Sequence, residues 1–95
     1  MTKADIVNTI ADATGISKVD TEAVVNAFLV SVGDALQDNQ TIEIRGFGTF
    51  LVREKQPRTA RNPRTGETVQ VPRKFVPAFK PSRDFKESVN QAIQK

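Results

Sequence analysis

The 95-residue chain contains no cysteine, no histidine, no tryptophan and no tyrosine. The absence of cysteine excludes disulfide bonds and thiolate metal sites. The absence of histidine removes the commonest general base and the commonest metal ligand. The carboxylates are scattered over amphipathic segments, and no candidate nucleophile has an evident base. We therefore expect neither an enzyme nor a protein that binds a metal, a cofactor or a small-molecule substrate.

Long apolar runs are missing as well. No run approaches the roughly 18 apolar residues that cross a membrane, and the opening MTKADIVNTI lacks the charged-then-apolar pattern of a secretory signal. We expect a soluble intracellular protein with no membrane partner. Residues 1–95 are enough for one small domain, and without disulfides or a metal its core is near the limit for a stable monomer.

Charge is distributed unevenly, although the net charge is only +3. Residues 1–52 hold three basic and seven acidic side chains, whereas residues 53–83 hold nine basic and two acidic ones. Residues 84–95 have no net charge. An acidic body that carries one concentrated basic segment indicates a polyanionic partner that approaches from one side.

Residues 1–40 have the pattern of a helical hairpin. Thr2 and Asp5 show the spacing of a capping box, apolar residues then recur at helical intervals, and Gly15 ends the first helix. A second helix follows, with a broad apolar face that contains Phe28. A face of this breadth suits a helix that is covered on more than one side.

The hydrophobic period changes to two at Thr41, which indicates strands. We expect residues 41–52 and 75–81 to form a three-stranded antiparallel body sheet, with a tight hairpin turn at the GFG sequence that begins at Gly46. Residues 82–95 then form a C-terminal helix with a serine cap. The predicted fold class is α+β.

Residues 53–74 continue the strands of this sheet as a long protruding ribbon. Pro57 and Pro72 cannot donate to a hydrogen-bond ladder, so we expect no neighbouring strand beside the ribbon. An isolated two-stranded ribbon is only marginally stable in water, so it should be mobile until it meets a surface. The ribbon has no aromatic residue and carries these cations: Arg53, Lys55, Arg58, Arg61, Arg64, Arg73 and Lys74.

Two interpretations of these cations are open. They could serve only to prevent edge-to-edge aggregation, a known use of charge on exposed strands. They could also bind a polyanion, and the excess of arginine over lysine favours multidentate contact with phosphate. Single-strand binders stack bases on aromatic rings, which this ribbon lacks, so a duplex with its electronegative minor groove is the better match.

The tip of the ribbon has the sequence RNPRTG. A turn is sufficient to explain Asn62, Pro63 and Gly66, because proline presets φ at the second turn position and glycine closes the loop. A rigid apolar ring at the end of a cationic ribbon has a second use, since it can wedge between stacked base pairs. The residues alone leave both interpretations open.

The motifs GFGTF at 46–50, RTARNPRTGE at 58–67 and VPAFKPSRDFKESVN at 76–90 resemble the bacterial histone-like HU and integration host factor (HU/IHF) family. The resemblance covers nearly the whole chain. It implies an intertwined homodimer or heterodimer that reaches around double-stranded DNA with two β-arms, in the nucleoid of the bacterial cytoplasm. HU and IHF are themselves standard examples of minor-groove binders with apolar wedges, so this mechanism comes from the resemblance.

The resemblance also implies roles for residues. Pro63 would be the intercalating wedge, and Phe28, Phe47, Phe50 and Phe79 would form the apolar core of the dimer. Arg64 adds charge at the tip, and Ser82 with Arg83 replaces a common Gly-Lys pair while it keeps the cation. The implied DNA-binding residues are Lys3, Arg45, Arg53, Lys55, Arg58, Arg61, Asn62, Pro63, Arg64, Arg73, Lys74, Lys80, Arg83 and Lys86.

The implied function is that of an architectural protein that bends and compacts DNA largely without regard to sequence. Such a protein should prefer bent, nicked or gapped DNA. Arg45 before the turn is similar to one subunit type of integration host factor, which would indicate a site-preferring bender, whereas VPAFKP is more like HU. A more distant alternative is a protein interaction module whose basic arm binds acidic partners.

Overall fold

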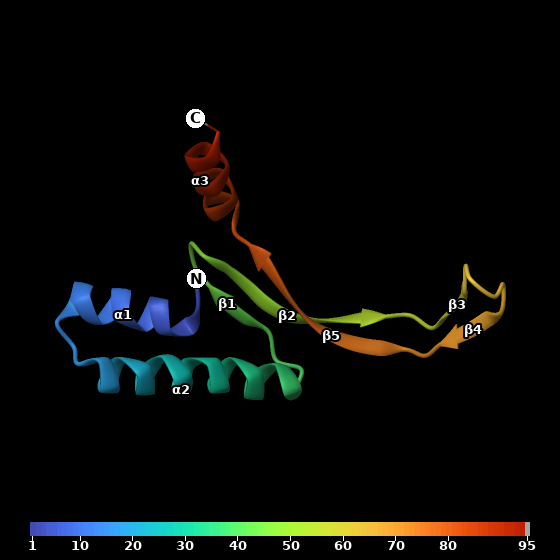
Figure 1. Ribbon diagram of the computed structural model, residues 1–95, viewed down its shortest axis with the longest axis horizontal. Coiled ribbons are helices and arrows are strands. Elements are labelled where there is room, and N and C mark those ends of the chain that lie inside the picture. The colour runs from blue at the N-terminus through green and yellow to red at the C-terminus, as the bar shows by residue number, and fades with distance from the viewer. Residues whose placement is uncertain (95) are drawn as a thin grey trace. The chain divides into compact units, whose positions relative to one another are not determined.

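The computed structural model describes residues 1–94 and confirms the α+β class (Figure 1). The chain divides into two compact units, Met1–Ala35 and the part that begins at Leu36, so the prediction of one domain over residues 1–95 stays a prediction. The elements are α1 (Lys3–Thr14), α2 (Lys18–Gln37), β1 (Ile42–Ile44), β2 (Gly48–Lys55), β3 (Arg58–Arg61), β4 (Thr68–Val71), β5 (Lys74–Pro81) and α3 (Arg83–Ile93).

The first unit contains α1 and most of α2, and α1 begins and ends where the sequence predicts. The Thr2 backbone N–H donates to the Asp5 carboxylate at 2.8 Å, and the Asp5 N–H donates to the Thr2 hydroxyl at 3.3 Å, which completes the capping box. Gly15 ends α1 in a left-handed conformation with φ of 76°. The Ser17 hydroxyl accepts from the Asp20 N–H at 3.1 Å and so caps the start of α2.

Very little apolar surface is buried. Within the part of the chain that the structure describes, the only buried apolar residues are Val7 and Ala11. The predicted broad apolar face of α2 is partly open instead: Val24 is 67% exposed, Phe28 49% and Leu29 52%. Soluble proteins rarely leave a contiguous apolar surface of this kind uncovered. The exposed face of α2 therefore requires a covering surface.

The second unit contains the predicted three-stranded antiparallel sheet, in the order β1-β2-β5. Ile42 pairs with Phe50, and the β2–β5 ladder runs without interruption from Gly48 opposite Pro81 to the pair Lys55 and Lys74. Regular pairing thus continues for three residues into the predicted arm, as far as Lys55, while the boundary between body sheet and arm stays a prediction. The base of the arm is part of the sheet.

The turn between β1 and β2 is the predicted hairpin. The Phe47 N–H donates to the Ile44 carbonyl at 3.0 Å, and Gly46 has a φ of 81° that disfavours other residues. Gly48 is required for a different reason: a Cβ atom there would lie 2.6 Å from both the Lys80 carbonyl oxygen and the Phe79 ring. The two glycines of the GFG sequence thus permit the turn and the close approach of β5.

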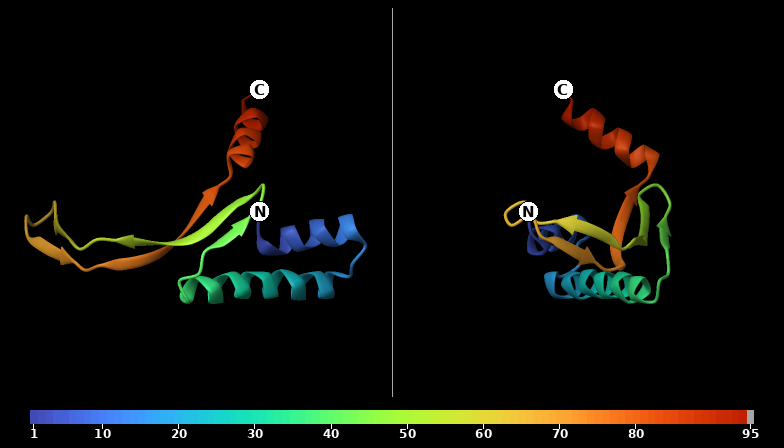
Figure 2. Two further views of the ribbon diagram at one scale, coloured as in Figure 1. Left: turned by 180° about the vertical axis from the view of Figure 1, so that it is seen from behind. Right: turned by 90° about the vertical axis from the view of Figure 1, so that its right-hand side faces the viewer.

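Beyond the sheet, β3 and β4 form a separate two-stranded ladder from the pair Arg58 and Val71 outward (Figure 2). The gap between the two ladders contains two residues on each strand, which places Pro57 opposite Pro72. Proline has no N–H to donate, so facing prolines account for the interruption. The arm is therefore two short ladders joined at a proline pair, and these residues lie outside regular pairing as expected.

Helix α3 starts at the predicted cap. The Ser82 hydroxyl accepts from the Phe85 N–H at 3.1 Å and donates to the Gly46 carbonyl at 3.1 Å, while the Ser82 N–H donates to the Phe47 carbonyl at 2.9 Å. These bonds connect the start of α3 to the β1–β2 turn. Among residues 1–94, no helix has both the length and the apolar character that a membrane crossing requires.

Candidate nucleic-acid interface

Strand pairing sorts the side chains of the sheet onto two faces, because paired residues share a face and neighbours along a strand alternate. The apolar face carries Ile42, Ile44, Phe50, Val52, Phe75, Pro77 and Phe79, together with Glu54. The opposite face carries every cation of the three strands: Arg53, Lys55, Lys74 and Lys80. We call this second face the cationic face.

The cations of this face have no carboxylate partner. Among residues 1–94 the only ion pair is Arg83 with Glu87, at 3.4 Å between exposed side chains. Lys55 and Lys74 lie directly opposite each other at the end of the β2–β5 ladder. Like charges in that position destabilise a sheet. The repulsion between Lys55 and Lys74 therefore lowers the stability of the fold, and a bound anion would offset this repulsion.

A cavity of about 330 Å³ lies where the β1–β2 turn, β5 and the start of α3 meet. Its charged lining residues are Arg45, Lys80 and Arg83, together with Glu43. The structure therefore brings Arg45 together with two predicted site residues that lie far from it in the sequence, Lys80 and Arg83. Glu43 is a neighbour that sequence reasoning missed, although its alternation with Ile42 and Ile44 could have placed it on this face.

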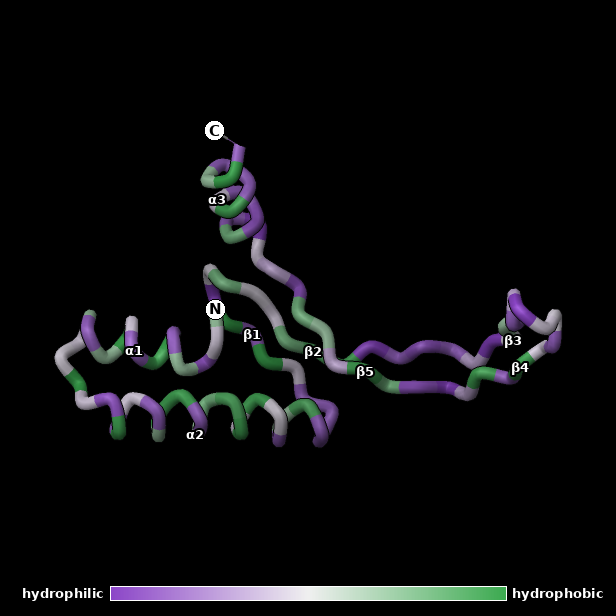
Figure 3. Tube along the Cα trace, viewed as in Figure 1, coloured by the Kyte–Doolittle hydropathy of each residue, from purple (hydrophilic) through white to green (hydrophobic). Residues whose placement is uncertain are grey.

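The arm continues the cationic character of the sheet. All seven of its cations are exposed, and Figure 3 shows hydrophilic residues along the outer half of β2. At the proline pair, an opening of about 440 Å³ is lined by Lys55, Arg58 and Lys74. The Arg73 guanidinium lies 5.3 Å from the centre of the Phe75 ring, a cation–π contact.

The tip of the arm is a closed loop around Pro63. The Asn62 N–H donates to the Glu67 carbonyl at 2.8 Å, and the Gly66 N–H donates to the Asn62 carbonyl at 2.7 Å. The Arg64 N–H donates to the Asn62 side-chain oxygen at 2.9 Å, and Gly66 has a left-handed φ of 75°. The predicted turn is confirmed. Pro63 is exposed, whereas its use as a wedge remains a prediction.

An aromatic cluster occupies the apolar side of the second unit. Phe47, Phe50 and Phe79 are brought together as expected, with ring centres 4.8 Å apart for Phe50 and Phe79. Phe85 of α3 also belongs to the cluster, stacked on Phe47 at 4.9 Å. Sequence reasoning did not predict this contact of Phe85. Phe28 lies in the first unit, on α2, and is 49% exposed.

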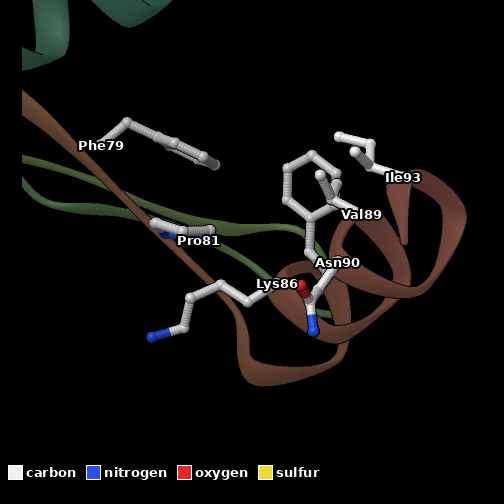
Figure 4. Close-up of a pocket in the computed structure, with 7 residues that line it drawn as sticks. Phe79, Pro81, Lys86, Val89, Asn90 and Ile93 are labelled. Carbon is white, nitrogen blue, oxygen red and sulfur yellow. The ribbon is translucent and has the colours of Figure 1, made fainter.

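A groove of about 490 Å³ extends from this cluster along α3 (Figure 4). Phe79 and Pro81 of β5 face Val89 and Ile93 of α3 across it, and the Lys86 side chain extends away from Val89 and Ile93. Val89 and Ile93 are 43% and 77% exposed. The groove is a second apolar surface that the chain by itself leaves open.

The remaining predicted site residue is Lys3, in the first unit. Its ammonium group donates to the Asn26 side-chain oxygen at 2.8 Å, which fixes it on the helical hairpin. The described residues contain no cluster of three or more His, Cys, Asp or Glu side chains that could hold a metal ion.

A helical hairpin, a three-stranded sheet with one cationic face, a basic two-stranded ribbon and a capped last helix together define a small histone-like α+β protein. The chain belongs to the family of bacterial DNA-binding proteins, which it matches over residues 1–90. The family resemblance inferred from the three sequence motifs is confirmed.

Integration host factor subunits and HU proteins are both similar to this chain over nearly its full length. Integration host factor subunit beta of Marinobacter nauticus is 45% identical over 96 residues, which cover 100% of this chain and 98% of that one. DNA-binding protein HU of Geobacillus stearothermophilus is 40% identical over 89 residues, 94% of this chain and 99% of that one. An Anabaena HU–DNA cocrystal structure matches with a TM-score of 0.87 and 34% identity, over 94% of this chain and 97% of that one.

Proposed function

We propose that this protein is an architectural protein of the bacterial nucleoid that binds and bends double-stranded DNA as a dimer. The observation that carries the proposal is the cationic face, on which all cations of the sheet lie together without carboxylate partners. This face leads into an arm whose cations are equally free. The names of the relatives, DNA-binding protein HU and an HU–DNA cocrystal, support the same ligand.

Dimerisation follows from the two apolar surfaces. The exposed face of α2 and the groove along α3 cannot both remain in water in a stable small protein. A second copy presents the same surfaces, so a symmetric dimer can cover all of them at once. The cationic face lies opposite the apolar face of the sheet and so remains free for DNA. A related subunit in place of the second copy would satisfy the same requirement.

The arms enter the minor groove, and Pro63 wedges between base pairs at each tip. Smooth bending of a binding site costs on the order of 1 to 6 kcal/mol. Unstacking adds about a few kcal/mol for each opened step. Contacts between the cationic face and phosphates of the flanking DNA offset these costs, since a bent duplex meets more of the protein. Phosphate contacts carry no sequence information, so binding is largely independent of sequence.

The Pro63→Ala variant tests the wedge. We expect it to reduce the bend angle more than the affinity, because the arm cations remain while the rigid ring is lost. Wild-type protein should bind a nicked duplex about tenfold more tightly than an intact one, since a nick removes part of the unstacking cost. Fluorescence energy transfer across the site reports the bend. Equal bending by the variant, or equal wild-type affinity for nicked and intact DNA, would contradict the wedge.

A site-preferring bender is the second candidate, favoured by the cavity that collects Arg45, Lys80 and Arg83 with Glu43. Cations that gather around one cavity suit the reading of groove shape better than a dispersed set of phosphate contacts does. The similarity to an integration host factor subunit supports the same candidate.

Competition between one defined site and random DNA separates the two candidates. A general bender gives an affinity ratio near unity, whereas a site-preferring one gives roughly a thousand or more. If the protein is a site-preferring bender, Arg45→Ala should lower this affinity ratio. The slope of log affinity against log salt should change by about 0.9 at most, which is the contribution of one phosphate contact. Selection of bound fragments from random-sequence duplexes supplies the defined site. A ratio near unity for the wild type excludes this candidate.

A further inference from the structure

The side chain of Asn62 forms a hydrogen-bonded bridge across Pro63. Its Oδ1 atom accepts from the Arg64 N–H at 2.9 Å, so the residue before the proline is bonded to the residue after it. The two backbone bonds of Asn62, to Glu67 and Gly66, close the rest of the loop. Of these three bonds, only the bridge to Arg64 depends on the identity of a side chain.

Packing does not hold the tip in place. Every residue from Arg61 to Gln70 is exposed, and the outer ladder contains only the pairs between Arg58–Arg61 and Thr68–Val71. Proline fixes its own φ but leaves its ψ free and offers no N–H to the loop. The direction of the Pro63 ring relative to the strands therefore depends on local hydrogen bonds, as in other turns that an asparagine side chain closes.

We propose that Asn62 is a positioning residue that sets the direction of the Pro63 ring through the hydrogen bond to Arg64. This inference rests on the proposed function, in which Pro63 is the wedge. A ring that is already aimed loses less conformational freedom when it enters the base stack. A ring that swings on an open loop meets the base step in the correct orientation less often. Asn62 thus acts on the bend of the DNA through Pro63.

The competing explanation is a direct contact between the Asn62 amide NH₂ group and a base edge or phosphate. Three substitutions separate the two roles. Asn62→Leu has a similar size and removes both the acceptor and the donor. Asn62→Asp and Asn62→Ser each keep an oxygen that can accept from the Arg64 N–H, and each lacks the amide donor.

We expect Asn62→Leu to lose at least half of the bend angle that Pro63→Ala loses, measured by fluorescence energy transfer on an intact duplex at saturating protein. In the free protein, the Arg64 amide should exchange with solvent about tenfold faster or more, while the melting temperature stays unchanged because the tip is exposed. Asn62→Ser and Asn62→Asp should retain most of the bend, although the added negative charge of Asp weakens the affinity.

The double variant Asn62→Leu/Pro63→Ala completes the test. If Asn62 acts through Pro63, the double variant bends DNA no less than Pro63→Ala alone. A bend in Asn62→Leu equal to that of the wild type, or equal losses in the Leu, Ser and Asp variants, would overturn the positioning role. Failure of the proposed function itself is distinguishable, because Pro63→Ala would then bend DNA like the wild type.

Discussion

A variant in which residues 56–72 are replaced by a short glycine link is expected to lose at least 100-fold in affinity for duplex DNA at moderate salt, and to lose nearly all of the bend. The excised segment contains Arg58, Arg61 and Arg64 in each chain, together with Pro63. Each phosphate contact contributes about 0.9 to the slope of log affinity against log salt, so removal of six arginines from a dimer lowers that slope by up to about 5.

The link leaves the sheet complete, because it begins after the last pair of the β2–β5 ladder, Lys55 with Lys74. Unchanged circular dichroism and thermal unfolding would show that the body still folds. A matched control keeps the arm and changes its three arginines to glutamine. The control should lose the salt dependence as the excision does but keep part of the bend, since Pro63 remains. Binding is measured by titration of a labelled duplex at several salt concentrations.

The excision also tests the more distant possibility of a protein interaction module. A basic arm that serves acidic proteins should bind an acidic polypeptide at least as well as a DNA duplex of equal charge. For the proposed function, the acidic polypeptide competes poorly, because it has no groove for the arms to enter. Full bending by the excised protein would remove the arm, and with it the wedge, from the mechanism.

Local sequence signals predicted the elements of the fold well. The ends of α1 and α3 are set by side chains that bond to nearby backbone groups, Thr2 with Asp5 and Ser82 with Phe85, so their effect is visible in a few consecutive residues. The GFG turn is local in the same way. How far regular pairing extends into the arm could not be predicted, because pairing depends on the register with the opposite strand and not on a change in composition.

The residues of the candidate site could be named from the sequence, but their arrangement in space could not be predicted. Alternation along β2 and β5 puts Arg53 and Lys55 on one face of one strand, and Lys74 and Lys80 on one face of the other. Whether these faces coincide depends on the register of the two strands, which the sequence does not specify. The same limitation hid Phe85, whose contact with Phe47 arises only when the Ser82 cap joins α3 to the turn.

We expect the two faces of the sheet to have different roles, with the apolar face deciding whether the protein folds. Phe79→Ala is expected to lower the free energy of unfolding by about 3 to 5 kcal/mol, the cost for a buried ring, because Phe79 contacts Phe47 and Phe50. Phe79 is 37% exposed in the single chain, and the proposed dimer would cover the groove along α3 that this ring lines. For a domain of this size, such a loss lowers the melting temperature by about 15 °C or more. Since a single chain buries almost no apolar surface, loss of the cluster should separate and unfold the dimer in one step.

Urea unfolding followed by circular dichroism tests this expectation, because the chain has no tryptophan to report by fluorescence. The wild-type midpoint should rise with protein concentration, as for any dimer that folds on assembly. Phe75→Ala is the matched control: Phe75 lies on the same face but is 54% exposed, and its cation–π contact with Arg73 is worth about 1 kcal/mol or less at an exposed site. Equal destabilisation by the two variants would mean that the aromatic cluster has no special role. A midpoint independent of concentration would mean that each chain folds alone, and the two cationic faces would then have no reason to act on one duplex.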